Sequence, residues 1–209
     1  MGDTHSLAVG VILYPGFDTL DAMGPVELLS VPIVASKFKL ILMSLDGQAV
    51  TSSAGVRVVP DSSCADHPTL DVLLVPGGPG ARQLVKDNTF MEWLQNVYHG
   101  KQSNKLLYLL SVCTGSALLA KSGLLDHKRA TSHNQAFDWV KSQSESTTWV
   151  KRARWVEDGN ILTSSGVSAG MDMTMFFIDK VAGSDVANQV AAYTEYDGQW
   201  TDPGADKWA

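Results

Sequence analysis

Runs of consecutive apolar residues recur along this 209-residue chain, and stretches with helical periodicity separate them. A strand that is apolar on both faces has to be covered on both faces, which is typical of parallel sheets in α/β proteins. The sequence therefore predicts a mostly parallel sheet flanked by helices on both faces. The expected strands are residues 7–14, 38–45, 56–59, 72–75, 106–112 and 129–132, with 149–155 and 160–164 in a hairpin around Glu157-Asp158-Gly159.

The stretches between the apolar runs are expected to form helices. These are residues 18–31, 81–86, 89–98, 114–121, 168–181 and 185–196, and either Asp18 or Thr19 is the expected N-cap of the first. From about residue 197 the chain has turn residues without periodicity, so we expect an irregular tail. The length and the lack of a linker predict a single domain over residues 1–209.

Charge and cysteine content disfavour several classes of protein. The formal net charge of -6 disfavours a nucleic-acid binder, which needs a basic face. Two cysteines are few for a disulfide-stabilised secreted chain, and the N-terminus shows no signal peptide. No apolar run approaches the ~18 residues that a membrane span needs. We therefore expect a cytoplasmic protein that binds neither nucleic acid nor membrane, and we expect no metal site, because Cys64 has too few candidate ligands near it.

Cys113 stands between the most apolar run and a helical stretch rich in small residues, in Ser111-Val112-Cys113-Thr114-Gly115-Ser116. A strand that turns sharply into a helix presents one side chain at the sheet edge, as in a nucleophile elbow. The helix N-terminus and free N–H groups there stabilise a thiolate, so we expect a nucleophilic cysteine with a lowered pKa. The alternative is a buried structural cysteine, because free cysteine is among the most buried residue types.

A glycine-rich loop, residues 76–80, follows another apolar run and is expected at the same edge of the sheet. Its glycines allow backbone N–H groups to point into a site, and Gly78 with Thr114 could form an oxyanion-type pocket. The alternative is a tight turn without a further role. A phosphate-binding loop is disfavoured, because no Gly-Lys-Ser/Thr sequence follows.

Two further side chains are candidates for proton transfer. Asp21 lies on an otherwise apolar helical stretch, where burial would raise its pKa towards neutral pH. The alternative is a surface acid at the start of a helix, and Glu27 is the rival acid on the same stretch. His133 follows Cys113 by about twenty residues and could act as its base. No acid stands beside His133 to orient it, so a pocket-lining role is favoured.

These segments resemble the ThiJ/PfpI superfamily, which has the flavodoxin-like, class I glutamine amidotransferase-like fold. Within it they are most similar to the isocyanide (isonitrile) hydratases, and the resemblance covers nearly all of the chain. The matching segments are Tyr14-Pro15-Gly16-Phe17, Leu20-Asp21-Ala22-Met23-Gly24-Pro25, Leu74-Val75-Pro76-Gly77-Gly78-Pro79-Gly80, the Cys113 segment above, Gly123-Leu124-Leu125, Arg129-Ala130-Thr131-Ser132-His133, and Leu162-Thr163-Ser164-Ser165-Gly166-Val167-Ser168-Ala169-Gly170-Met171-Asp172.

The resemblance implies a hydro-lyase that needs no cofactor. Cys113 would attack the terminal carbon of R–N≡C, and Asp21 would hydrogen-bond the thiol and shuttle protons. Gly78 and Thr114 would supply backbone N–H groups near the sulfur. Water would then hydrolyse the thioimidate and release an N-substituted formamide.

The resemblance also implies a homodimer whose partner in the reaction is a small-molecule substrate. We expect His133, Gly77 and Val167 to line the substrate pocket.

Other members of the superfamily provide the alternatives. Proteases have His after the nucleophile and amidotransferases a downstream His-x-Glu, but Thr114 follows Cys113 and Asn134-Gln135 follow His133. Transcription regulators carry a helix-turn-helix extension, for which a chain ending at Ala209 is expected to leave no room. Two alternatives stay open. One is a glyoxalase-like hydrolase of α-oxoaldehydes that would depend on His133, and the other is a non-enzymatic redox sensor in which Cys113 is oxidised without turnover.

Overall fold

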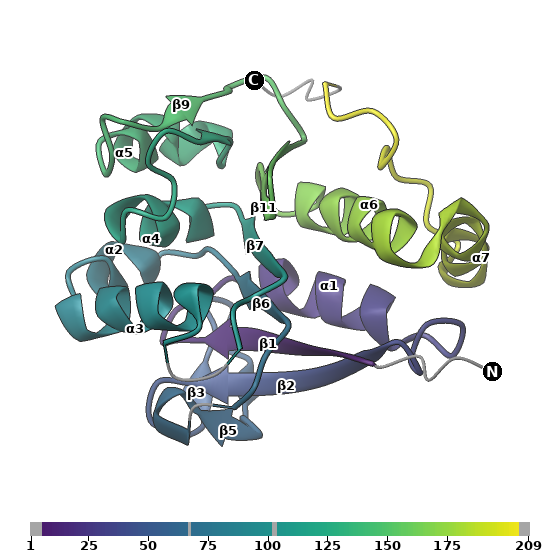
Figure 1. Ribbon diagram of the computed structural model, residues 1–209, viewed down its shortest axis with the longest axis horizontal. Helices are drawn as coiled ribbons and strands as arrows, with labels where there is room; N and C mark the ends of the chain where they lie inside the picture. The colour runs from purple at the N-terminus through teal and green to yellow at the C-terminus, as the bar shows by residue number, and fades with distance from the viewer. Residues whose placement is uncertain (1–5, 67, 102–103, 205–209) are drawn as a thin grey trace.

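The computed structural model of the protein describes residues 6–66, 68–101 and 104–204 (Figure 1). Its main sheet has seven strands in the order β10-β11-β7-β6-β1-β2-β5. All neighbours pair in parallel except β10 and β11, which form an antiparallel hairpin. The strands are β1 (Leu7–Leu13), β2 (Phe38–Ser44), β5 (Ser62–Ser63), β6 (Val72–Val75), β7 (Tyr108–Val112), β10 (Trp155–Asp158) and β11 (Ile161–Ser164).

Helices cover both faces of this sheet, which confirms the predicted α/β fold (Figure 1). One face carries α1 (Thr19–Ser30), α6 (Ala169–Ala182) and α7 (Ser184–Thr194). The other carries α2 (Ala81–Leu84), α3 (Asn88–His99) and α4 (Gly115–Lys121), with α5 (Phe137–Lys141) packed against α4.

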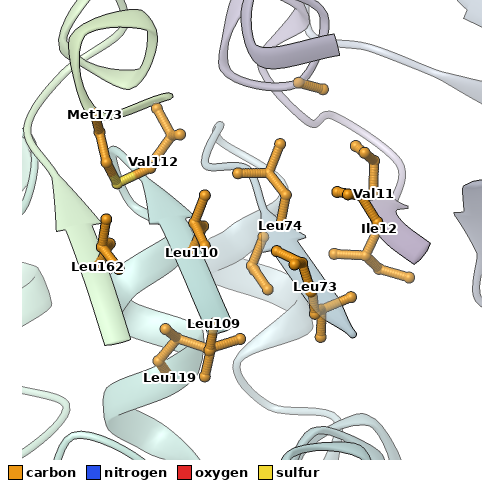
Figure 2. Packing of buried hydrophobic residues seen from close by; sticks show 14 of the residues in the cluster. Val11, Ile12, Leu73, Leu74, Leu109, Leu110, Val112, Leu119, Leu162 and Met173 are labelled. Carbon is orange, nitrogen blue, oxygen red and sulfur yellow. The ribbon is translucent and has the colours of Figure 1, made fainter. Parts of the chain in front are cut away.

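The core lies on both sides of the central strands (Figure 2). Figure 2 shows Leu109 of β7 next to Leu119 of α4 on one side, and Val112 of β7 next to Met173 of α6 on the other. All four side chains are completely buried. Successive side chains of a strand point to opposite faces. A strand covered by helices on both faces therefore has to be apolar at every position, which explains the continuous runs in the sequence.

One expectation about strands was wrong. Residues 149–155 do not form one strand: the hairpin strand β10 begins only at Trp155, and Trp149 ends the two-residue strand β9 (Thr148–Trp149), which pairs with β8 (Arg129–Ala130). Three basic residues, Lys151, Arg152 and Arg154, break the apolar pattern between them. The short strand expected at 56–59 is present as β4 (Arg57–Val58), and it pairs with β3 (Val50–Thr51) in a separate sheet.

Residues 197–204 form no helix or strand. The remaining tail residues, 205–209, lie outside the described residues, as do residues 1–5, on which the expectation about a signal peptide depended. Within the described ranges, no helix combines the length and the apolar character that crossing a membrane requires.

Candidate active site

Four neighbouring parallel strands end at one edge of the sheet, and the loops that follow them meet there. These strands are β11, β7, β6 and β1, in that spatial order. They lead into residues 165–168, Cys113, residues 76–80 and residues 14–18, respectively. Ligands of open parallel sheets bind at this edge. The topology therefore brings together the segments that were singled out in the sequence.

Cys113 occupies the turn between β7 and α4 with a backbone φ of 57°, which is uncommon for a residue other than glycine. Hydrogen bonds hold its backbone in this conformation. Its N–H donates to the carbonyl of Ser164 at 3.1 Å. The hydroxyls of Ser132 and Ser116 donate to its carbonyl at 2.9 and 3.1 Å. The surrounding structure thus maintains a strained backbone at this residue, as is common at functional sites.

Glycines allow the loops to approach one another closely around Cys113. A Cβ atom at Gly115 would overlap the carbonyl oxygen of Val75, where α4 begins against the end of β6. A Cβ atom at Gly77 would lie 2.6 Å from Oγ1 of Thr114 and 2.9 Å from Oδ2 of Asp21. Gly77 therefore lies between Asp21 and the residue that follows the cysteine.

Asp21 is completely buried on α1. Its Oδ2 accepts a hydrogen bond of 3.0 Å from the Gly77 N–H, whereas its Oδ1 has no hydrogen-bond partner among the described residues. Burial, and secondarily the charge of Asp18, raise the pKa of Asp21 to about 8, although the Gly77 N–H and the Cys113 thiol oppose this shift. This carboxyl group is therefore mostly protonated at neutral pH.

The thiol of Cys113 is also buried, and this corrects the expectation of a lowered pKa. Burial, followed by the negative charge of Asp21, raises the pKa of Cys113 above its ordinary range. The backbone N–H groups of Thr114 and Val167 act in the opposite direction but do not outweigh burial. The sequence indicated the helix N-terminus at this position, but not how completely the neighbouring loops would exclude water.

The backbone donors near the sulfur differ from those expected. The Gly78 N–H donates to Oγ1 of Thr114 at 2.9 Å rather than to the sulfur, in a loop where Gly78 has a φ of 123°. The N–H of Val167 faces the thiol together with that of Thr114. Val167 has a φ of 30°, which is unusual for a β-branched residue. Its backbone role could not be inferred from the sequence, because valine normally favours extended backbone.

Two adjoining cavities open at this site. The first, of about 330 Å³, is lined by Cys113, Thr114 and Gly78 among others. The second, of about 360 Å³, shares His133, Gln135 and Val167 with the first. His133 packs on the backbone of Gly166, where a Cβ atom would overlap its imidazole ring. Gly77 lines neither cavity and instead contacts Asp21.

The rival acid Glu27 and the second cysteine, Cys64, lie elsewhere. Glu27 is exposed on α1 and lines neither cavity. Cys64 begins the 3-10 helix η1 (Cys64–Asp66) and lines a separate cavity with Trp93, and burial raises its pKa to about 12. Among the residues that the structure describes, no cluster of three His, Cys, Asp or Glu side chains has the arrangement of a metal site.

Sequence reasoning missed several residues of the site. Tyr14 is buried next to Asp21, and its hydroxyl donates to the carbonyl of Pro76 at 2.7 Å. The guanidinium of Arg82 lies 4.2 Å from the ring centre of Trp139 in the wall of the first cavity. Tyr14 could have been noticed as a polar group at the end of a buried strand. The Arg82–Trp139 contact depends on tertiary structure alone.

Comparisons with known proteins agree with the fold. The sequence matches the DJ-1/PfpI family over residues 8–180. It is 34% identical to the isonitrile hydratase of Pseudomonas putida over 192 residues, which are 91% of this chain and 79% of that protein. It is 28% identical to the HTH-type transcriptional regulator GbdR of Pseudomonas aeruginosa, over 91% of this chain but only 51% of the regulator. The crystal structure of a THiJ/PfpI family protein from Pseudomonas syringae superposes with a TM-score of 0.80 at 28% identity, covering 93% of this chain and 77% of that one. The chain belongs to the DJ-1/PfpI family.

Proposed function

We propose that this protein hydrates an isocyanide, R–N≡C, to an N-substituted formamide, with Cys113 as the nucleophile and Asp21 as the proton donor. One observation carries the proposal: a completely buried carboxyl group with a pKa of about 8 lies beside a thiol at the ligand-binding edge of the sheet. The similarity to a protein named isonitrile hydratase, at 34% identity, supports the same choice of substrate.

In the first step the S–H bond of Cys113 adds across the terminal carbon of the isocyanide. A bond forms between sulfur and carbon, and the carboxyl group of Asp21 gives its proton to that carbon while it takes the thiol proton. The product is a thioimidate, Cys–S–CH=N–R, and Asp21 is again protonated. The raised pKa values of Asp21 and Cys113 suit this step, because both protons are present at neutral pH.

In the second step water adds to the thioimidate carbon. The water oxygen bonds to carbon, Asp21 accepts a proton from the water, and its own proton passes to nitrogen. The hydroxyl group of this adduct then gives its proton to Asp21, which protonates the sulfur as the C–S bond breaks and a C=O bond forms, and the formamide R–NH–CHO leaves. The N–H groups of Thr114 and Val167 support the proposal, because they face the sulfur and stabilise negative charge on it as the bond breaks.

The two cavities suggest how the substrate lies. The isocyano group would enter the cavity that holds Cys113, and the substituent R would extend past Val167 into the second cavity. Apolar groups from Leu20 and Val167 line that second cavity together with polar side chains.

The burial of Cys113 weighs against a redox sensor. Oxidation of cysteine by peroxide depends on exposure and on the fraction of thiolate. The side chain is 7% exposed, and its pKa is raised. Both properties slow oxidation relative to an accessible, acidic thiol.

The test is an assay of purified protein with a panel of isocyanides and with methylglyoxal, detecting formamides and lactate by mass spectrometry. We expect formamide from at least one isocyanide, and His133→Ala should reduce this activity only mildly. Turnover of methylglyoxal alone, with a severe loss in His133→Ala, would instead establish the glyoxalase-like function. Rapid oxidation of Cys113 at low peroxide, with no turnover of either class, would establish the sensor.

A further inference from the structure

Asp172, in the first turn of α6, is the centre of a buried polar cluster next to the second cavity, which its partner Arg154 lines. Its carboxylate is 1% exposed. Oδ2 accepts hydrogen bonds from Nε of Arg154, at 2.8 Å, and from Nη2 of the same guanidinium. Oδ1 accepts from the hydroxyl of Tyr196, at 2.7 Å, and from the N–H of Gln199, at 2.8 Å. A buried carboxylate with four donors is fully satisfied, so the cluster holds Arg154 and the tail in one arrangement.

The described part of the tail contacts the cluster at more than one residue. Figure 1 shows it, in yellow, running back from α7 past α6. Besides Tyr196 and Gln199, the carbonyl of Pro203 accepts a hydrogen bond of 2.7 Å from the backbone N–H of Arg154. Arg154 is thus bonded to α6 through its side chain and to the tail through its backbone.

Arg154 also holds both ends of the loop that carries Val167. The Ser165 N–H donates to the carbonyl of Arg154 at 2.8 Å. At the other end, Nη2 of Arg154 donates to the hydroxyl of Ser168 at 3.4 Å. Val167 lies between these two points with its unusual φ of 30°. An isolated valine does not keep this conformation, and the bonds at residues 165 and 168 restrain it together with the Gly170 N–H, which donates to the Val167 carbonyl at 3.3 Å.

We propose that Arg154, fixed by Asp172, is a positioning residue that holds the N–H of Val167 against the thiol of Cys113. Arg154 lines the second cavity, where the substituent R would lie, but not the cavity of Cys113, so it touches neither the sulfur nor the reacting atoms. It acts through the 165–168 loop, and it couples the tail to the site through Asp172. Only the consequence for catalysis rests on the proposed hydratase function. The position of the Val167 N–H is a property of the resting protein.

The test measures the rate constant for alkylation of Cys113 by iodoacetamide at fixed pH, followed on the Cys113 peptide by mass spectrometry so that Cys64 does not contribute. Asp172→Asn removes the charge that holds the guanidinium. The N–H of Val167 then leaves the sulfur, the thiolate loses a donor, and we expect alkylation to slow by about tenfold. Arg154→Lys keeps an ion pair with Asp172 and should slow alkylation less.

Ile178→Val is the matched control, because Ile178 is completely buried in the same helix and its apolar side chain makes none of the hydrogen bonds of the cluster. It should lower the melting temperature without slowing alkylation. If Asp172→Asn does not fold, Tyr196→Phe, which removes one donor to Asp172, takes its place with a smaller decrease. An unchanged or faster alkylation in folded Asp172→Asn, or an equal decrease in Ile178→Val, would overturn the proposal. If the wild type turns over no isocyanide, the hydratase function fails while this comparison of alkylation rates stands.

Discussion

At the scale of single residues, the burial of Asp21 and Cys113 decides how this site can work. The loops exclude water from both groups, and each has a raised pKa in consequence. A thiol that is protonated at rest differs from the activated thiolate that a helix N-terminus suggests. The neutral pair is nevertheless suited to adding S–H across carbon, because the carboxyl group can give one proton as it receives another.

Cys113→Ala should abolish turnover of isocyanide while the protein remains folded, because the thiol contributes a bond to the substrate rather than core volume. Steady-state kinetics and thermal unfolding check the two halves of this expectation. Cys64→Ala is the control and should keep its activity, since Cys64 lines a different cavity. Substantial turnover in Cys113→Ala would exclude a covalent thioimidate.

Asp21→Asn should lower turnover by at least ~10²-fold, the ordinary range for loss of a general acid. The amide keeps the size of the side chain and can accept the Gly77 hydrogen bond, but it cannot release a proton. Cys113 should remain open to alkylation in this variant. Turnover near the wild-type rate would place the acid elsewhere, with His133 the next candidate, because Glu27 lines neither cavity.

The raised pKa of Asp21 also predicts how stability depends on pH. Its pKa is about 8 in the folded protein and ~3.9 in an unfolded chain. Between these two values the folded state binds more protons than the unfolded state. The free energy of unfolding should therefore fall with rising pH, relative to Asp21→Asn, by at most about 1.4 kcal/mol per pH unit. Denaturant unfolding of both proteins across this pH range measures the difference, and a difference that is independent of pH would contradict the raised pKa.

The value of kcat/KM should also decline as the pH rises through about 8, because Asp21 then loses the proton that it would give to the substrate carbon.

At the scale of secondary-structure elements, the sequence predicted the long strands that are buried on both faces, and it missed several two-residue strands that form through a few local contacts. The strands β1, β2, β6 and β7 begin and end within two residues of the expected positions, because a strand covered on both faces is apolar throughout. The two-residue strands β3, β5 and β9 have no periodicity to detect.

The same limit applies to the candidate site. Asp21 and Cys113 stood out because each departs from its apolar surroundings. The direction of the Gly78 N–H and the pairing of Arg154 with Asp172 arise only when distant segments meet.

The junction of β7 and α4 gives a prediction at this scale. Gly115→Ala places a Cβ atom onto the Val75 carbonyl, so α4 has to shift away from β6. We expect a loss of roughly 1–3 kcal/mol in the free energy of unfolding, the usual cost of overpacking, and slower turnover because Cys113 moves with the helix. Gly55→Ala is the control. It has a φ of 82° but open space at the added Cβ, and it should cost less and leave turnover unchanged. A loss at Gly115 no larger than the loss that the positive φ causes at Gly55 would show that the added Cβ atom fits without displacing α4.

At the scale of the whole molecule, we predict a two-fold symmetric homodimer, the commonest assembly of soluble proteins. The expectation comes from the family resemblance rather than from an exposed surface of this chain. Sedimentation equilibrium at micromolar concentration should give twice the chain mass of 22.5 kDa. A single species at the chain mass would contradict it.

The strand order has a consequence for synthesis on the ribosome. β7 pairs with β6, which precedes it in the chain, and with β11, which follows it by about fifty residues. Until β11 has left the exit tunnel, the most apolar strand of the sheet has one open edge, of the kind that recruits other chains. Neither Ser164, which binds the Cys113 N–H, nor Val167 is available before that moment. A nascent chain thus carries Cys113 in an incomplete pocket, and it is at this stage that we expect the protein to depend most on chaperones.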